Sequence, residues 1–495
     1  MLAPRIKKTA NSAYLLPPLK GWNPSQHPFS MDDSEASLLD NFIVEQGEVR
    51  VRYGVDNLVN ITGGVETLFN FRDVRHLCAT PTKIIDITNP LFPTDKATGM
   101  GSGLYINTTY KNLMFMVNGV DAARVYDGST IATTGFTGFT DIPTYVAVSH
   151  NRVFFAPKDT LSFDYGVAGA IAGTLTNFSL NGYCRKGGTL IAIGTWTRDG
   201  GNGMEDLTVF ITSMGEVIVY QGTDPDDVTN WSLVGVYEAA QPMNNRCLLK
   251  WGGELMYLSK DGWQPLSFAL NEGRTNPRGK ISDKIRKALK QSIITSNYWQ
   301  AHFAPDLGLI YINVPVATGQ NCQFVLSLDS GVWTSYSGLH ARCFGNYQGK
   351  VYYGTSIGVT QAEIGYNDNG NIISAQVLTG NLSIGNKGSI KQFTWLKPII
   401  ETNGTMQPLV QLDIDYAQKI IYGNALISEE ATSLWDVADW DVTPWGIEKK
   451  LSPILSGAGG VGRTAALRMT LSSQFYPVKW LGTEILYNTG GTSFN

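Results

Sequence analysis

Short apolar runs recur along the chain, and each is followed by a polar turn and another strand-like segment. Successive runs begin about 36 to 55 residues apart, which is the spacing of blades in a β-propeller. The runs are continuous rather than strictly alternating, as expected for strands that are buried on both faces. They are Leu77 with Ile84–Ile85, Leu113–Val117, Val153–Phe155, Leu207–Ile211, Leu255–Leu258, Leu309–Ile312 and Val351–Tyr353.

The turns beside these runs are rich in Gly, Asp and Asn, which readily adopt the positive φ of tight hairpins. Examples are Asn118-Gly119, Met214-Gly215, Asp261-Gly262 and Ser330-Gly331. We therefore predict a β-propeller-like domain of about six or seven hairpin units. It covers residues 61–375. A large β-sandwich or an irregular β-protein is the alternative interpretation.

The composition favours an all-β fold. The 495 residues include 53 Gly, 22 Tyr, 20 Phe and 12 Trp, and only 16% of residues are charged, against about 25% in average domains. Many turns and many aromatic side chains are typical of short strands joined by tight turns. The chain is also longer than one typical domain, so two or three domains, or one large repetitive domain, are expected.

The segments on either side of the repeats differ from them in residue pattern. Residues 1–60 contain several prolines and are predicted to form an extended N-terminal arm and the first platform strands, with one or two strands within Leu38–Tyr53. Residues 376–495 contain longer alternating segments and are predicted to form a C-terminal β-sandwich or platform domain. The alternating segments are Gln407–Tyr416, Ala465–Leu471 and Val478–Tyr487.

Residues 281–293 break the strand pattern. Ile281, Ile285, Leu289 and Ile293 are spaced as on one face of a helix, with Lys and Arg on the other face. This spacing predicts one short amphipathic helix on the surface, inserted between two blades.

The formal net charge is −4, and the chain has no stripe of Lys and Arg of the kind that reads DNA sequence. A small basic cluster, Arg5, Lys7 and Lys8, is interpreted as a solvated terminus. We find no signal-peptide core and no apolar window of about 18 residues. We therefore expect a protein that is made in the cytoplasm and does not span a membrane.

The five cysteines are widely separated and show no C-x-x-C spacing. They are Cys78, Cys184, Cys247, Cys322 and Cys343. An odd number with wide gaps argues against a disulfide framework and against a zinc site. We interpret them as reduced, small hydrophobic side chains.

One glycine-rich stretch, SGAGGVGRT at Ser456–Thr464, fits both G-x-G-x-x-G and a phosphate-binding loop pattern with Arg463 in place of Lys. Both interpretations require a preceding buried strand and a following helix, and the next segment, Leu467–Leu471, alternates like a strand. We therefore predict a mobile loop that binds no nucleotide. A nucleotide-binding enzyme built on this stretch is the alternative.

Other candidate chemical groups have weaker patterns. Ser327–Trp333 resembles the Asp-box of sialidase propellers, which is a hairpin device. A glycosidase would need two converging carboxylates, and the available ones are Asp224, Asp226, Asp227, Asp436, Asp439 and Asp441. The five histidines are isolated from one another and from any cysteine pair. We predict no enzymatic activity and no catalytic, cofactor-binding or metal-binding residues.

The most unusual stretch places Trp435, Trp440 and Trp445 five residues apart among carboxylates. Tryptophan dominates the hot spots of protein interfaces, so these three residues are candidate interface anchors. The alternative is that they cap the core of the C-terminal domain.

Several motifs together resemble one family. They are Leu39–Phe42 with Gly47 and Val49–Gly54; Gln221–Asp227 with Trp231–Gly235; Leu255–Leu258 with Asp261–Leu266; and Trp435–Trp445. In these motifs the chain resembles the tail hub or nozzle proteins of short-tailed, podovirus-like phages, also called DNA stabilisation or head-to-tail proteins. The motifs span residues 38 to 445.

The resemblance implies a structural protein of the virion tail, a homohexameric ring below the portal and head–tail adaptor proteins. Such a ring closes the head after DNA packaging and conducts DNA through its lumen during ejection, without sequence-specific binding. Tail fibre, spike and needle proteins are further implied partners, although the sequence contains no long insertion that would indicate a fibre-docking domain. A glycan-binding or depolymerising propeller at the host surface is the alternative function.

Overall fold

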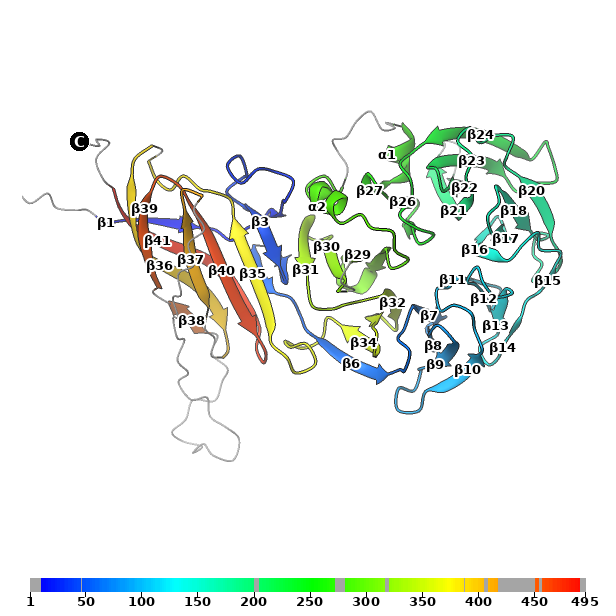
Figure 1. The fold of residues 1–495 in the computed structure, drawn as a ribbon, viewed down its shortest axis with the longest axis horizontal. Coiled ribbons are helices and arrows are strands. Elements are labelled where there is room, and N and C mark those ends of the chain that lie inside the picture. The colour runs from blue at the N-terminus through cyan, green and yellow to red at the C-terminus, as the bar shows by residue number, and fades with distance from the viewer. Residues whose placement is uncertain are drawn as a thin grey trace, which may run out of the picture. The chain divides into compact units, whose positions relative to one another are not determined.

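The computed structural model describes residues 10–45, 47–199, 204–271, 281–316, 320–386, 388–404, 408–416, 450–453 and 456–489 (Figure 1). The chain divides into two compact units. The first, the sandwich unit, contains residues 1–56, 325–337 and 363–495. The second, the propeller unit, contains residues 57–324 and 338–362. The sandwich unit is therefore assembled from three separate stretches of chain.

The described part of the propeller unit consists of seven successive antiparallel repeats, which confirms the predicted fold class. The first repeat contains β7 (Thr67–Phe71), β8 (Arg75–Ala79), β9 (Lys83–Asp86) and β10 (Thr94–Thr98). The second contains β11 (Ile106–Tyr110), β12 (Leu113–Val117), β13 (Arg124–Tyr126) and β14 (Ile131–Thr133). The third contains β16 (Pro143–Ser149), β17 (Arg152–Pro157), β18 (Ser162–Tyr165) and β20 (Thr176–Ser179). A short parallel pair, β15 (Gly135–Thr137) and β19 (Ala172–Thr174), lies beside the third.

The fourth repeat contains β21 (Leu190–Asp199), β22 (Met204–Thr212), β23 (Glu216–Gly222) and β24 (Trp231–Glu238). The fifth contains β25 (Leu248–Trp251), β26 (Glu254–Ser259) and β27 (Gly262–Pro265). The sixth is the hairpin of β28 (Gln300–Ala304) and β29 (Leu309–Val314), joined by the 3-10 turn Pro305–Leu307. The boundary between the two units falls within β30 (Cys322–Ser327).

The last repeat joins the two ends of the propeller unit. It contains β32 (Cys343–Tyr347), β33 (Lys350–Gly354) and β34 (Gly358–Ala362), and its fourth strand is β6 (Val55–Asn60) from the N-terminal side. The Ile61 amide donates to the Ile357 carbonyl at 2.9 Å, and the Val65 amide donates to the Thr355 carbonyl at 2.8 Å. This pairing closes the series of repeats on itself, as in propellers that combine their first and last strands.

The apolar runs form the strands that the sequence predicts, and their side chains fill the spaces between neighbouring repeats. One cluster joins Phe154 and Phe163 of the third repeat to Phe210 and Tyr220 of the fourth, with the Phe163 and Phe210 rings stacked at 4.5 Å. Similar clusters join the first repeat to the second, the second to the third and the last to the first. Strands packed on both faces explain why the runs do not alternate.

Among the described residues, two short α-helices interrupt the strands. The helix predicted over residues 281–293 is present but shorter, as α2 (Arg286–Gln291) between β27 and β28. Ser282 does not cap it, because its hydroxyl accepts from the Trp263 amide at 3.0 Å and donates to the Trp263 carbonyl at 2.8 Å. The sequence did not predict α1 (Leu266–Asn271). No helix among the described residues is long and apolar enough to cross a membrane.

The described residues of the sandwich unit form two sheets. Sheet A has the order β38 (Lys450–Pro453), β36 (Lys391–Thr402), β41 (Val478–Thr489), β5 (Glu48–Val51) and β4 (Phe42–Glu45); β39 (Ser456–Gly462) also pairs with β36, and β1 (Ala10–Leu15) with β41. The part of sheet B within this unit has the order β31 (Val332–Tyr336), β3 (Glu35–Asp40), β35 (Ile373–Thr379), β40 (Ala465–Ser473) and β37 (Leu409–Ile414), and β2 (Gly21–Trp22) pairs with β3. Strand β40 contacts both β41 and β5 across the sandwich.

The prediction of a glycine-rich loop is wrong: Ser456–Gly462 is strand β39, paired with β36. The inward-facing glycines allow the two sheets to approach. A Cβ at Gly460 would lie 2.1 Å from Ile414 Cδ1, and one at Gly462 would lie 2.3 Å from Ile414 Cγ2. The glycines therefore serve close packing, and no helix follows them to form a phosphate site.

All five cysteines are free, and Cys78, Cys247 and Cys343 are buried. The predicted turn glycines Gly119, Gly215, Gly262 and Gly331 all have positive φ. The Asp-box-like segment is a hairpin turn, in which the Gly331 amide donates to the Ser327 carbonyl at 2.9 Å.

Candidate functional site

The residues that carry the family resemblance near the N-terminus form a buried ionic joint in the sandwich unit. Arg52 follows β5 and is 1% exposed. Its guanidinium donates to both carboxylate oxygens of Asp368, at 2.9 and 2.7 Å, and to Asn41 Oδ1 at 2.8 Å. A bidentate arginine–carboxylate pair is among the stronger and more directional polar contacts in proteins.

Asn41 occupies the point where the chain passes from β3 in sheet B to β4 in sheet A. Its φ of 57° lies in the left-handed region, which Asn tolerates better than most residues. Its amide donates to Ser337 Oγ at 3.1 Å and to the Ser374 carbonyl at 2.9 Å. The joint therefore connects the N-terminal segment, the hairpin 325–337 and the C-terminal segment.

Two further residues of the motif complete the joint. Asp40 accepts hydrogen bonds from Ser335 Oγ at 2.7 Å and Ser337 Oγ at 2.5 Å. Burial nevertheless raises the pKa of the Asp40 carboxyl above its usual value. Gly54 must be glycine, because a Cβ there would lie 1.9 Å from the Asn367 carbonyl oxygen.

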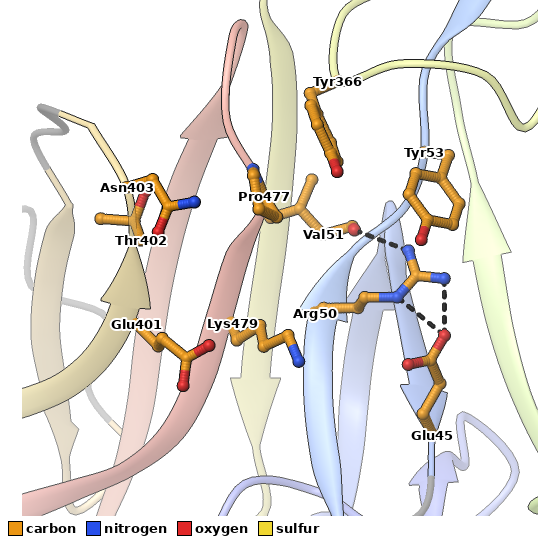
Figure 2. Close-up of a pocket in the computed structure, with 10 residues that line it drawn as sticks. All are labelled: Glu45, Arg50, Val51, Tyr53, Tyr366, Glu401, Thr402, Asn403, Pro477 and Lys479. Atoms are coloured by element: carbon orange, nitrogen blue, oxygen red, sulfur yellow. Dashed lines mark hydrogen bonds and ion pairs between the residues drawn. The ribbon is translucent and has the colours of Figure 1, made fainter. Parts of the chain in front are cut away.

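A pocket of about 250 Å³ lies beside this joint, within the sandwich unit (Figure 2). One wall contains Arg50, whose Nε and Nη2 contact Glu45 Oε1 at 2.8 and 2.6 Å. The guanidinium lies 4.0 Å from the centre of the Tyr53 ring. Burial opposes the charge on Arg50, but Glu45 outweighs it and raises the pKa of Arg50. The lining residues are Glu45, Arg50, Val51, Tyr53, Tyr366, Glu401, Thr402, Asn403, Pro477 and Lys479.

Lys479 of β41 is the cross-strand neighbour of Arg50 and also lines the pocket, and its Nζ lies 2.7 Å from Glu48 Oε1. The hydrogen bond to Glu48 raises the pKa of Lys479. The Tyr53 and Tyr366 rings are 5.8 Å apart and tilted by 38°. The pocket thus offers paired charges, amide and hydroxyl groups and half-buried aromatic rings, which together suit a small, neutral, polar ligand.

A smaller cavity of about 160 Å³ lies in the propeller unit, lined by residues of β7, β11, β16, β25, β28 and β32. Arg246 lines it and donates to the Glu66 carbonyl at 3.0 Å and to Thr67 Oγ1 at 2.6 Å. Burial lowers the pKa of Arg246. Both donated bonds come from Nη2, whereas the buried Nη1 has no hydrogen-bond partner among the described residues.

The three predicted interface residues, Trp435, Trp440 and Trp445, lie outside the described residues, as do Asp436, Asp439 and Asp441. The other candidate carboxylates belong to a turn. Asp224 Oδ2 lies 2.6 Å from Arg152 Nη2, Asp226 accepts from the Tyr165 hydroxyl, and Asp227 accepts from the Thr229 amide at 2.9 Å. Hydrogen bonds that Asp227 accepts from the Thr229 hydroxyl and amide lower its pKa.

The histidines do not come together with other ligating side chains. Burial lowers the pKa of both His76 and His302 to about 4. His302 Nε2 lies 2.7 Å from Asn346 Oδ1. Across the described ranges, no group of three or more His, Cys, Asp or Glu residues could hold a metal ion.

Sequence reasoning missed the pocket of Figure 2. The available signal was the alternation of Arg50 and Arg52 with Val49 and Val51, which places two arginines on one face of a short strand. The partners Asp368 and Tyr366 are more than three hundred residues away in sequence, so no local pattern reveals them.

The fold defines a β-propeller protein that also contains a β-sandwich unit. No family model matches the chain, and no curated protein matches it. It is similar in fold to the WD40 β-propeller domain of Doa1, with 10% identity, 62% of this chain and 96% of that chain covered, and a TM-score of 0.39.

Two other solved structures are similar at the same level. One is Raptor of Chaetomium thermophilum, with 11% identity, 63% of this chain and 29% of that chain covered, and a TM-score of 0.38. The other is YCF48 bound to D1 peptide, with 8% identity, 68% of this chain and 99% of that chain covered, and a TM-score of 0.38.

Proposed function

We propose that this chain is a structural, non-enzymatic subunit of a phage tail, which assembles with copies of itself into the hub or nozzle ring below the portal and adaptor. The observation that carries the proposal is the joint around Arg52. The residues that resemble the family, Asp40, Asn41 and Arg52, hold three distant segments together with buried hydrogen bonds. These contacts make the subunit rigid, which a subunit of an ordered ring requires.

The remaining chemical motifs also support an architectural role. The glycine-rich stretch is a packed strand, the Asp-box-like segment is a hairpin, and the Asp224–Asp227 carboxylates stabilise a turn. A subunit with a formal charge of −4 suits a conduit for DNA, because each neutralised phosphate adds salt-dependent affinity that would hinder passage.

The assembly state tests this proposal directly. The full chain should form a closed ring, the resemblance implying six copies, and native mass spectrometry with negative-stain electron microscopy measures the copy number and shape. Antibodies against the chain should label the tail end of purified virions of its source phage. A chain that stays monomeric at concentrations of tens of micromolar, and is missing from those virions, would refute the proposal.

The pocket of Figure 2 favours a second candidate function, the binding of a glycan. Its volume of about 250 Å³ is below the roughly 300–1,000 Å³ of pockets for drug-sized ligands, and it suits a single sugar residue. Glu401, Asn403 and Thr402 offer hydrogen-bonding groups, and the Tyr53 and Tyr366 rings offer apolar surface for a sugar face.

A glycan array probed with the full chain tests this second candidate. Binding should be lost in Tyr366→Ala and kept in Phe92→Ala, which removes an exposed aromatic side chain of the propeller unit. Equal binding by both variants, or no bound glycan on the array, would reject the pocket as a sugar site.

A further inference from the structure

In one part of sheet A, the outermost strand on each side has no further described strand beside it. The order there is β39–β36–β41–β1, because Trp395 of β36 lies opposite Leu486 of β41 and Gly457 of β39, and Leu486 lies opposite Ser12 of β1. Among the described residues, β39 pairs only with β36 and β1 only with β41. Each outer edge therefore presents a row of backbone N–H and C=O groups that no described strand satisfies.

The sequences of both edge strands lack the residues that usually prevent pairing with another chain. Proteins commonly place charged residues or proline on an exposed edge strand. Neither β39, with sequence SGAGGVG, nor β1, with sequence ANSAYL, contains a charge or a proline. The two strands have seven and six residues, long enough for an extended ladder of hydrogen bonds.

The inward and outward glycines of β39 differ in the space around them. Gly460 and Gly462 face Ile414 and admit no side chain, whereas a Cβ at Gly457 or Gly459 would meet no atom of the described residues within 4 Å. Both outward glycines are exposed. Small residues at these positions leave room for the side chains of an incoming strand, and an aromatic ring beside such a glycine can cover it.

The outer face of sheet A carries exposed apolar side chains near these edges, because Tyr14, Trp395 and Val461 are 55%, 45% and 62% exposed. Polar residues lie among them, with Lys397 Nζ of β36 3.7 Å from Glu484 Oε2 of β41. The outer face of sheet B is more polar, with Ser374 and Gln376 exposed on β35 and Arg468 Nη2 paired to Asp413 Oδ2 at 2.7 Å, although Leu409 is 47% exposed there. Exposed apolar side chains bordered by polar residues are typical of an interaction site.

Strand direction identifies the occupant that fits. The pairings β39–β36, β36–β41 and β41–β1 are all antiparallel, so β39 and β1 run in opposite directions. A second copy placed beside the first with its sheet in the same orientation would bring its β1 antiparallel to β39 of the first. The added pair would continue the antiparallel pattern without a break.

We propose that copies of this chain associate by adding β1 of one subunit to the outer edge of β39 of the next, in a head-to-tail contact. This inference rests on the proposed function, since it identifies the surface through which the ring forms. A heterologous contact of this kind repeats until the rotation closes, which is the contact that a ring needs. Two-fold pairing of β39 with β39, or of β1 with β1, would instead stop at dimers.

The test uses the full chain with a lysine placed on each edge in turn, Gly459→Lys on β39 and Ser12→Lys on β1. Both positions are exposed, and the control is Ser374→Lys on the outer face of sheet B. By native mass spectrometry, each edge variant should be monomeric at concentrations at least tenfold above those at which the unmodified chain forms rings. The control should form rings as the unmodified chain does. Thermal melts establish that all three variants are folded.

Mixing the two edge variants gives the decisive result. One variant keeps a free β1 edge and the other a free β39 edge, so an equal mixture should form dimers and nothing larger. Dimers formed by either variant alone would show two-fold pairing and overturn the inference. Rings formed by both edge variants would overturn it too, while leaving the proposed assembly function intact.

Hydrogen exchange on the unmodified chain provides a measurement that needs no substitution. Amides in Ala10–Leu15 and Ser456–Gly462 should exchange at least tenfold more slowly in the ring than in monomer obtained by dilution. Unchanged exchange in both strands would reject the edge contact. An unmodified chain that never assembles would overturn both the inference and the proposed function.

Discussion

At the scale of single residues, the sandwich unit depends on one buried arginine. Arg52 is buried, so water cannot take the place of a lost hydrogen-bond partner. Asp368, Asn41 and Asp40 lie around its guanidinium. A buried ion pair adds little net stability by itself, but removing one partner leaves the other charge uncompensated. The motif around Arg52 therefore specifies which segments join, more than how strongly the subunit is folded.

Replacing this arginine should be costly. Arg52→Met keeps much of the side-chain volume and leaves the Asp368 carboxylate without its bidentate partner, so we expect a loss of about 3–5 kcal/mol in the free energy of unfolding. Arg75→Met is the matched control, since Arg75 is 44% exposed and its contact with Asp86 is 4.0 Å long. That change should cost less than about 1 kcal/mol. Equal losses in denaturant titrations would contradict the assignment.

Buried histidine predicts how stability depends on pH. Burial lowers the folded-state pKa of His76 from 6.5 to about 4, so the unfolded chain binds the proton more readily. The resulting contribution is present above pH 6.5 and is lost as pH falls towards 4. For this one group, the free energy of unfolding changes by at most about 1.4 kcal/mol per pH unit.

His76→Phe removes this titration and keeps a ring that can stack on Tyr347, which now lies 4.7 Å from the imidazole. Between pH 6.5 and 4 the free energy of unfolding of this variant should fall less steeply than that of the unmodified chain. Denaturant titrations across that range measure both slopes. Parallel curves would show that His76 does not contribute.

At the scale of elements, the two faces of strand β39 have different roles. Its inward glycines allow β37 to approach, and its outward glycines leave the edge open. Alternation of side chains in a strand separates the two sets, so substitutions on the two faces should behave differently.

Gly462→Ala should destabilise the sandwich unit by about 1–3 kcal/mol, because the added methyl overlaps Ile414 Cγ2 and Asp415 Oδ2. Gly457→Ala adds the same methyl on the open face and should change stability by no more than about 0.5 kcal/mol. Thermal melts of the two variants give the comparison. A second substitution, Ile414→Ala, should restore part of the loss in Gly462→Ala; failure to do so would point to another cause.

At the scale of the whole molecule, the sandwich unit cannot be separated by a single cut. The hairpin 325–337 belongs to it, although the chain on both sides of this hairpin belongs to the propeller unit. Trp333 and Tyr336 of this hairpin are 1% and 0% exposed, and the Tyr336 ring lies 5.5 Å from the Arg52 guanidinium. A fragment cut at the ends of the propeller unit would thus expose large aromatic side chains.

We expect the fragment 57–362 to aggregate or to bind a hydrophobic dye strongly. The same fragment with residues 325–337 replaced by a Gly/Ser linker should remain soluble and melt cooperatively, because it keeps residues 57–60 of β6, which close the last repeat. Size-exclusion chromatography and dye fluorescence compare the two. If both fragments behave alike, the hairpin does not need the sandwich unit.

The amino-acid sequence alone determined the local structure. The runs Leu113–Val117 and Val153–Phe155 became β12 and β17, and the glycine turns between strands have the positive φ that their residues favour. These features depend on neighbours within a few residues, and their regular recurrence indicated a propeller before any contact was known. The alternation in Ala465–Leu471 and Val478–Tyr487 indicated a half-exposed sheet in the same way.

Only the tertiary structure decided how distant segments combine. The glycine-rich stretch looked like a loop, since its residues have low strand propensity, and pairing with β36 and packing against Ile414 overrode that propensity. Arg50 and Arg52 look alike in sequence, yet one lines a pocket and the other is buried against Asp368. The physical reason is common to both cases: burial and charge pairing depend on residues tens to hundreds of positions away, and no local pattern carries that information.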